Sequence, residues 1–372
     1  MIIHIRLLTL CILTICLIPQ TAQPCTSFFL DKGNQLVVGF NLDWIVGGGL
    51  LTINKRGVSK TAMPTEKDTN VAKWTSKYGS VTLNHRGREF PFGGMNEAGL
   101  VVQMMALFET KYPAPDLRPY INNLQWIQYQ LDNFNKVEQV IASDSQLRII
   151  FLPHEPFGLH YLVSDRMGNC ASIEFIDGKL VYHTKETMPV KVLANSTYAE
   201  SIEFFYDEQS GTLPVGQGDN SLFRFVRAAE MLNNYNPNGS KSVVDYAFDI
   251  LSNVRATGGY YNLKEPIYTQ WSVIYDLQNL HIYFRTLENK NTRYINLKSF
   301  DFFCKTPVKV FDINANVSGN VTNSFVDYTY QSNRDLFKKA VDLLRGEALK
   351  PMSDEELDAI AHYPESTVCM DK

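Results

Sequence analysis

The alternation of apolar and polar positions predicts short strands joined by turns from Cys25 to about Phe108. "CTSFFL" and "QLVVGFNL" flank "DKGN", a pattern that predicts a β-hairpin. "GSVTLNH" and "REFPFGGM" are predicted to pair across Arg86-Gly87, and "NEAG" then turns into the strand "LVVQMMALF". Later, "HYLVSD", "ASIEFI" and "KLVYHT" predict a meander, and "WSVIYDL" with "HIYFRTL" predicts a second hairpin.

Helical spacing appears in four places along the chain. A helix is expected from near Pro119, where Leu124, Ile127 and Leu131 recur at helical intervals. "SLFRFVRAAEMLNNY", "KSVVDYAFDILSNV" and "DLFKKAVDLLRG" read as further amphipathic helices. Strands joined mostly as hairpins, with helices between groups of them, favour an α+β fold with antiparallel sheets. We expect one domain over 25–372, with a C-terminal helical extension from about 330.

The first 24 residues have the pattern of a secretory signal peptide. Arg6 precedes an apolar run at 7–18, and a short polar stretch follows. The run is shorter than a membrane span requires. We therefore expect a leader at 1–24 and a soluble, exported protein, periplasmic or secreted, with no stable membrane span in the mature form. The alternative is an uncleaved N-terminal anchor.

Composition narrows the choice of partner and cofactor. The formal net charge is -4 over 372 residues, which argues against a nucleic-acid partner. Four cysteines lie beyond the predicted leader, namely Cys25, Cys170, Cys304 and Cys369. Cys304 with Cys369 is the preferred disulfide, although spacing alone cannot fix the pairing. No Cys or His cluster has metal-ligand spacing, so no metal site is expected.

Cys25 stands next to the predicted leader and could become the first residue of the mature chain. A thiol and a free α-amine would then lie on one residue, and the amine could act as a base near neutral pH. The hairpin returns Asp43 to the neighbourhood of Cys25, where a carboxylate could hold that amine. Three other interpretations of Cys25 remain: a lipoprotein acceptor, a disulfide partner or a small buried apolar residue.

The stretch "CTSFFLDKGNQLVVGFNLDW" resembles the opening of the linear amide C–N hydrolases, the choloylglycine hydrolase and penicillin V acylase family of N-terminal nucleophile enzymes. "FPFGGMNEAGLVV", "VLANST" and "SLFRFVRAA" continue the resemblance in the family's order, over about 25–290. The resemblance implies an αββα sandwich of two mostly antiparallel sheets between helix layers. It also implies hydrolysis of a small-molecule N-acyl amide through a thiol nucleophile, no cofactor, and a homo-oligomer.

The resemblance further implies roles for four residues. Cys25 matches the nucleophile, whose freed amine is the general base, and Asp43 matches the carboxylate that holds this amine. Asn195 matches a donor to the oxyanion of the tetrahedral intermediate. Arg224 matches a guanidinium near the nucleophile, although Arg227 lies three residues further on and could be confused with it.

The chain departs from the family pattern in two places. Where the family usually has "GRxxD" the chain reads "GFNLD", so that Phe40 replaces an arginine. After the "NEAG" turn the family carries an asparagine or tyrosine, and Gln103 is only a nearby substitute. The alternative function is a catalytically inactive, secreted binding protein on the same fold. The acyl group stays open among bile-salt conjugates, phenoxyacetyl amides, N-acyl lactones and N-acyl lipids.

Overall fold

Two sheets of mostly antiparallel strands form the centre of the described part of the chain. The computed structural model describes residues 25–65, 70–151, 157–210, 220–259, 264–344 and 352–370. The predicted leader at 1–24 lies outside these ranges.

The first sheet contains the strand that follows Cys25. Its path runs β14-β1-β2-β16-β17-β18-β20, with β15 paired to β16, and only β18 and β20 are parallel. The strands are β1 (Thr26–Leu30), β2 (Val37–Trp44), β14 (Val192–Leu193), β15 (Thr257–Gly259), β16 (Ile267–Asp276), β17 (His281–Thr286), β18 (Arg293–Asn296) and β20 (Gly319–Asn320).

The second sheet runs in the order β13-β12-β11-β8-β7-β6-β3-β19-β21. Its strands are β3 (Leu50–Asn54), β6 (Ser80–Asn84), β7 (Gly93–Asn96), β8 (Val101–Ala106), β11 (Leu159–Ser164), β12 (Cys170–Ile176), β13 (Lys179–Thr184), β19 (Lys309–Asp312) and β21 (Val326–Asp327). β11, β12 and β13 are sequential antiparallel neighbours, which confirms the predicted meander. Two small sheets join β9 (Tyr120–Asn122) with β10 (Arg148–Ile150), and β4 (Val58–Thr61) with β5 (Lys73–Thr75) and β22 (Val368–Cys369).

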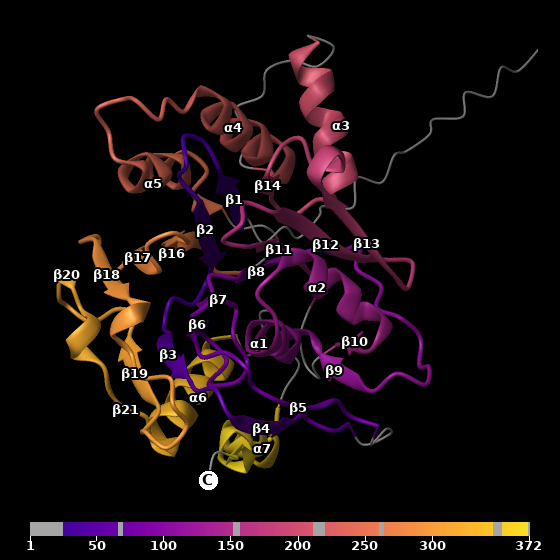
Figure 1. The fold of residues 1–372 in the computed structure, drawn as a ribbon, viewed down its shortest axis with the longest axis vertical. Helices are drawn as coiled ribbons and strands as arrows, with labels where there is room; N and C mark the ends of the chain where they lie inside the picture. The colour runs from indigo at the N-terminus through magenta and orange to yellow at the C-terminus, as the bar shows by residue number, and fades with distance from the viewer. Residues whose placement is uncertain are drawn as a thin grey trace, which may run out of the picture.

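Helices cover the outer faces of the two large sheets. The helices are α1 (Asn123–Asn133), α2 (Val137–Ala142), α3 (Tyr198–Gln209), α4 (Ser221–Asn234), α5 (Val243–Asn253), α6 (Tyr330–Leu344) and α7 (Asp354–His362). α4 and α5 pack on β1 and β2, while α1 packs on β7 and β8 (Figure 1). Because β1 also contacts β8 and β11, the sheets lie face to face. The architecture is the predicted α+β fold, an αββα sandwich.

The predicted hairpin at the start of the described chain is confirmed. β1 and β2 pair antiparallel with Thr26 opposite Asn41 and Leu30 opposite Val37. The turn between them places both Gly33 and Asn34 at positive φ, 63° and 62°, a conformation that glycine and asparagine tolerate best. β1 has a neighbouring strand on each side, β14 and β2, so it is not an edge strand of the sheet. Cys25 is the residue directly before it.

Two predicted elements begin later than expected. The helix expected near Pro119 starts at Asn123, because 120–122 pairs with β10 as a parallel strand and Asn122 caps the helix by accepting from the Gln125 N–H. The strand expected over "REFPFGGM" starts only at Gly93. Glu89 has a φ of 73° and Pro91 has no N–H to donate, so neither suits a strand.

The last two helices are fastened to the body of the molecule. Asn333 of α6 accepts from the Arg88 N–H at 2.7 Å and donates to the Ala361 carbonyl at 2.8 Å. Cys304 and Cys369 form a disulfide, the preferred pairing. In the described ranges, no helix combines the length and the apolar character that a membrane crossing needs.

Candidate active site

Cys25 is buried at the entry to β1, with 1% of its surface exposed. Because Thr26 pairs with Asn41, the end of β2 lies beside Cys25, and the Cys25 Sγ is 4.0 Å from the Asp43 backbone oxygen. Burial raises the pKa of the thiol to about 12, and the Asp43 carboxylate adds to this effect. The contact with the Asp43 backbone and the Arg224 charge act in the opposite direction. The protonated thiol is therefore the favoured form near neutral pH.

Asp43 lies near the end of β2 and is fully buried. Its Oδ1 accepts a hydrogen bond from the Thr269 hydroxyl of β16. The same hydroxyl oxygen accepts from the Ala256 N–H at 2.9 Å. The register between β16 and β2 shifts between Thr269 and Trp271, which is the signature of a β-bulge. The bulge places Thr269 opposite Asp43, so the carboxylate is held from the neighbouring strand.

Arg224 of α4 joins Cys25 to Asn195. Its Nη1 donates to the Cys25 carbonyl at 2.7 Å and to the Thr26 hydroxyl at 2.9 Å, and its Nη2 donates to the Asn195 Oδ1 at 2.9 Å. The side chain is fully buried, whereas Arg227 is only half-buried. Arg224 is thus the arginine that contacts Cys25.

Asn195 follows β14 and has 6% of its surface exposed. Its Nδ2 donates to the Ala106 carbonyl at 2.9 Å, and its backbone N–H donates to the Ser221 hydroxyl at 2.7 Å. With Oδ1 held by Arg224, the orientation of the amide is fixed at both ends. A side-chain amide nitrogen carries two hydrogens. One of them bonds to the Ala106 carbonyl.

The structure brings together the four residues singled out from the sequence, and it adds residues that were not. Thr26, Ser221 and Thr269 contribute hydroxyl groups, and Ala106 contributes a carbonyl. Ala106 is the last residue of β8, the strand that follows the "NEAG" turn, and its carbonyl accepts the hydrogen bond from Asn195.

Gln103 lies elsewhere. Its side chain donates to the Phe92 carbonyl at 2.9 Å and accepts from the Tyr275 hydroxyl at 3.1 Å. Both of these bonds go to residues outside the four candidates.

Aromatic side chains lie on and beside the end of β2. Phe40 is buried opposite Ser27 and Val273 in the sheet. Trp44, the residue after Asp43, packs edge-to-face on Phe157 with ring centroids 6.0 Å apart. The ring centroid of Phe108 is also 6.0 Å from that of Phe157. The surroundings of β2 are therefore apolar at Phe40 and aromatic at Trp44.

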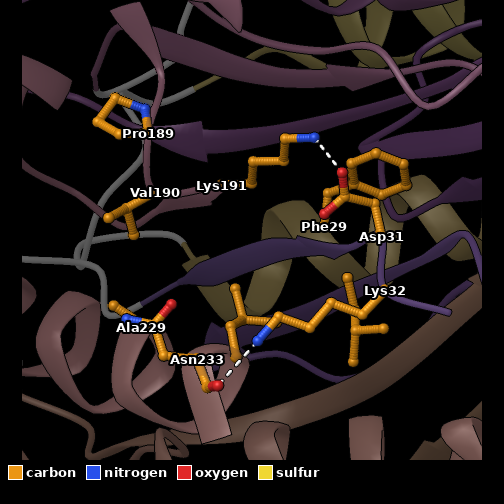
Figure 2. A pocket seen from close by; sticks show the side chains of 10 residues that line it. Phe29, Asp31, Lys32, Pro189, Val190, Lys191, Ala229 and Asn233 are labelled. Carbon is orange, nitrogen blue, oxygen red and sulfur yellow. Dashed lines mark hydrogen bonds and ion pairs between the residues drawn. The ribbon is translucent and has the colours of Figure 1, made fainter. Parts of the chain in front are cut away.

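Two cavities lie near the first sheet. One of about 120 Å³ is at the far end of β1 from Cys25, where Lys191 pairs with Asp31 and Lys32 donates to the Asn233 carbonyl at 2.8 Å (Figure 2). The other, of about 390 Å³, includes Thr269 in its lining and so adjoins the partner of Asp43. Of the two, only the second borders the network.

Comparison with known proteins decides the family. The model of the "Linear amide C-N hydrolases, choloylglycine hydrolase family" matches residues 25–319. The chain belongs to this family. It is therefore a hydrolase of carbon–nitrogen bonds other than peptide bonds, in linear amides. A penicillin V acylase from Pectobacterium atrosepticum is 29% identical over 261 residues, which cover 62% of this chain and 69% of that protein.

Solved structures of such hydrolases have the same fold. Penicillin V acylase from Agrobacterium tumefaciens superposes with a TM-score of 0.69 at 28% identity, covering 82% of this chain and 98% of that one. An arginine-to-leucine variant of conjugated bile acid hydrolase from Clostridium perfringens gives 0.65 at 21% identity, covering 79% and 98%. The latter supports the fold alone. Within the described ranges, no group of three His, Cys, Asp or Glu side chains is arranged to hold a metal ion.

Proposed function

We propose that this linear amide hydrolase uses the Cys25 thiol as its nucleophile and the Cys25 α-amine as its base. The observation that carries the proposal is the Arg224 guanidinium, which holds the Cys25 carbonyl and the Asn195 amide at the same time. A nucleophile and an oxyanion donor bound to one rigid group keep their mutual position, and such preorganisation lowers a reaction barrier. In the full-length chain the Cys25 nitrogen is bonded to Pro24, so the amine requires removal of 1–24.

The reaction then runs in two stages. The amine takes the thiol proton, the sulfur attacks the amide carbonyl, and the second Asn195 amide hydrogen donates to the oxyanion. The intermediate collapses to a thioester as the α-ammonium gives its proton to the leaving nitrogen. Water attacks the thioester, the amine takes one water proton, and this proton returns to the sulfur as the carboxylic acid leaves.

Asp43 supports the cationic form of the base in both stages. A carboxylate stabilises a nearby ammonium group, whereas an uncharged group of the same shape does so only weakly. The Thr269 hydroxyl holds one carboxylate oxygen in place. Asp43 thus orients the amine without exchanging a proton with the substrate.

For the substrate we propose an N-acyl amide with an apolar, ring-bearing acyl group, such as a phenoxyacetyl amide. Buried Phe40 and the contact of Trp44 with Phe157 support an apolar acyl site. The likeness to penicillin V acylases is consistent with this choice. Anionic groups close to the scissile bond would lack the arginine that the family pattern places at Phe40.

We further propose that the protein acts after export, in the periplasm or outside the cell. The support is the signal pattern at 1–24, and export would couple removal of the leader to the release of the amine. A small leader remainder could be removed by the thiol itself. Assembly as a homo-oligomer stays a prediction of the family resemblance.

Covalent labelling tests the proposal. A thiol-reactive acyl analogue should label the exported protein on the peptide that begins with Cys25, and Cys25→Ala should lose both label and turnover while staying folded. Cys170→Ala is the matched control, since Cys170 is also a buried free cysteine. Intact mass should show a chain that starts at Cys25. An active protein with residues upstream of Cys25 would rule out the amine as base, and absence of label and turnover on every amide tried would favour a binding protein.

A further inference from the structure

We propose that His160 is a positioning residue for the reaction, because it fixes the peptide unit that carries Asn195. This inference rests on the proposed function, since it assumes that Asn195 donates to the oxyanion. His160 lies on β11 of the second sheet, opposite Met105 of β8, and is fully buried. Its Nε2 is 2.7 Å from the Ala194 carbonyl oxygen, and its Nδ1 is 3.1 Å from the Glu174 Oε1.

The direction of the bond to Ala194 follows from elementary chemistry. A carbonyl oxygen can only accept, so the Nε2 of His160 must be the donor. The other ring nitrogen faces Glu174 of β12, and the same carboxylate oxygen accepts the Tyr198 N–H of α3 at 2.9 Å. Glu174 is buried, with 1% exposed. Glu174 of β12 thus helps to hold the imidazole in one orientation, and the same side chain is bonded to the first residue of α3.

The peptide unit between Ala194 and Asn195 is held from two opposite elements. His160 donates to its carbonyl from the second sheet, and Ser221 accepts from its N–H at the start of α4. A peptide unit is planar, so fixing both its oxygen and its nitrogen fixes the plane. The direction in which the Asn195 side chain leaves the backbone is then determined before any substrate binds.

We expect the hydrogen bond from His160 to the Ala194 carbonyl to affect the rate more than the substrate affinity. An oxyanion donor acts mainly in the transition state, so misplacing it lowers kcat and leaves KM nearly unchanged. Shifts of about 1 Å in a positioned group can cost about 100-fold in rate. A residue that only packs the core would not produce this split between kcat and KM.

Two substitutions of His160 separate its two bonds. A glutamine places its amide nitrogen near the position of the imidazole Nε2, and an asparagine places its own near that of Nδ1. His160→Gln should therefore keep the bond to Ala194 and retain kcat within about 5-fold of wild type. His160→Asn should keep only the bond to Glu174 and lose about 10- to 100-fold in kcat, with KM changed less than about 2-fold. Thermal stability is measured for both.

The outcomes are distinct. Rescue by glutamine but not asparagine, with similar melting temperatures, supports the inference. Equal kcat in the two folded variants, or a loss in KM alone, overturns it. If either variant does not fold, Ser221→Ala tests the opposite side of the same peptide unit: a fall in kcat at constant KM supports the inference, and an unchanged kcat overturns it. Retention of turnover by Cys25→Ala would instead refute the proposed function and, with it, this assignment, so the two failures are told apart.

Discussion

The molecule buries two clusters of charged and polar side chains that are built in different ways. In one, Lys60 of β4 lies 2.6 Å from the Glu89 carboxylate and 3.0 Å from that of Asp132 in α1, and each side chain is at most 1% exposed. In the other, around Cys25, the bonds of Arg224 described above end on a carbonyl, a hydroxyl and an amide oxygen. Burial and charge are common to both, so neither property alone distinguishes a candidate active site from a structural cluster.

The difference lies in what the bonds hold. In the Lys60 cluster each charge faces an opposite charge, and Asp132 also accepts from the Trp74 and Gln128 side chains at 2.8 Å. Around Cys25 the bonds of Arg224 hold the backbone of the cysteine and the side-chain amide of Asn195. A buried cluster of opposite charges stabilises the fold, whereas under the proposed function the cluster around Cys25 prepares a reaction. The predictions below test this division.

The largest effect is expected from breaking the Lys60 cluster. Burial alone would lower the pKa of Lys60, but Asp132 and Glu89 together raise it above its ordinary value of 10.5. While the two carboxylates are ionised, its charge therefore stabilises the fold below the ordinary pKa of lysine, and this stability is lost as the pH rises through the raised pKa. Lys60→Met should leave two buried carboxylates facing each other and cost about 3–5 kcal/mol in the free energy of unfolding.

Urea unfolding measures the loss of unfolding free energy in Lys60→Met. The kcat per folded molecule should not change. The control is a triple variant with Glu89→Gln and Asp132→Asn added, which should recover much of the stability. A variant that stays stable but loses turnover would contradict the division between the two clusters.

The next effect concerns the disulfide, which fastens the same end of the molecule as Lys60. Cys369 lies in β22, which pairs with β4, and the bridge to Cys304 spans 65 residues. Replacing both cysteines with serine should cost about 2–4 kcal/mol, because the unfolded chain regains the freedom of a long loop. Denaturant midpoints of the oxidised wild type and the double variant give the value. Loss of kcat in the folded double variant would show that this end also supports the reactive centre.

Asp43→Asn should act on the reactive centre alone. The amide can still accept from Thr269 but cannot stabilise an ammonium group, so kcat should fall at least about 100-fold, or about 2.7 kcal/mol. The melting temperature should stay near that of wild type. Thr269→Ser is the matched control, since it keeps the hydroxyl and should retain most of kcat. A loss of stability as large as the loss in rate would assign Asp43 a structural role.

The smallest effect is expected at Phe40. An arginine there would place a cation close to Cys25 and lower the pKa of its thiol, which burial now raises to about 12. Because a lower pKa exposes thiolate at lower pH, the rising limb of the pH–rate profile of Phe40→Arg should move down by about one unit. The preference for apolar acyl amides should weaken at the same time.

Phe40→Leu is the control for the loss of the aromatic ring without a charge. Identical profiles and substrate rankings for Phe40→Arg and wild type would mean that Phe40 only packs the sheet. A gain of turnover in Phe40→Arg over an inactive wild type would identify the missing arginine as the cause.

Sequence reasoning named side chains that the structure places close together, but it did not name the groups that hold them. Cys25, Asp43, Asn195 and Arg224 stand in motifs whose order is informative. Thr269 was missed because it reaches Asp43 through a bulge, and a register shift between distant strands leaves no mark in the local pattern. Ala106 was missed because it contributes a backbone carbonyl, an atom that every residue has.

In the fold, too, the elements with local sequence signals were predicted and those that depend on distant partners were not. The β1–β2 hairpin and the meander were predicted because turn residues and alternation are local signals. β9 was taken as helix because its pairing with β10 depends on a partner almost thirty residues away in the chain, beyond any local window. α3 was missed although Thr197 caps it by accepting from the Glu200 N–H, because one of its three buried positions, Ser201, is polar and blurs the apolar stripe.

The place of β1 between β14 and β2 has a consequence for any mature chain that begins at Cys25. The first residues of a chain usually fray and are open to exopeptidases. A chain that begins at Cys25 would instead start inside a sheet, with Thr26 paired to Asn41 on one side and Ser27 opposite Leu193 on the other. Arg224 also donates a hydrogen bond to the carbonyl of Cys25, which would be the first residue. The new end would be as ordered as the core around it, so maturation would expose a reactive amine without creating a loose, digestible terminus.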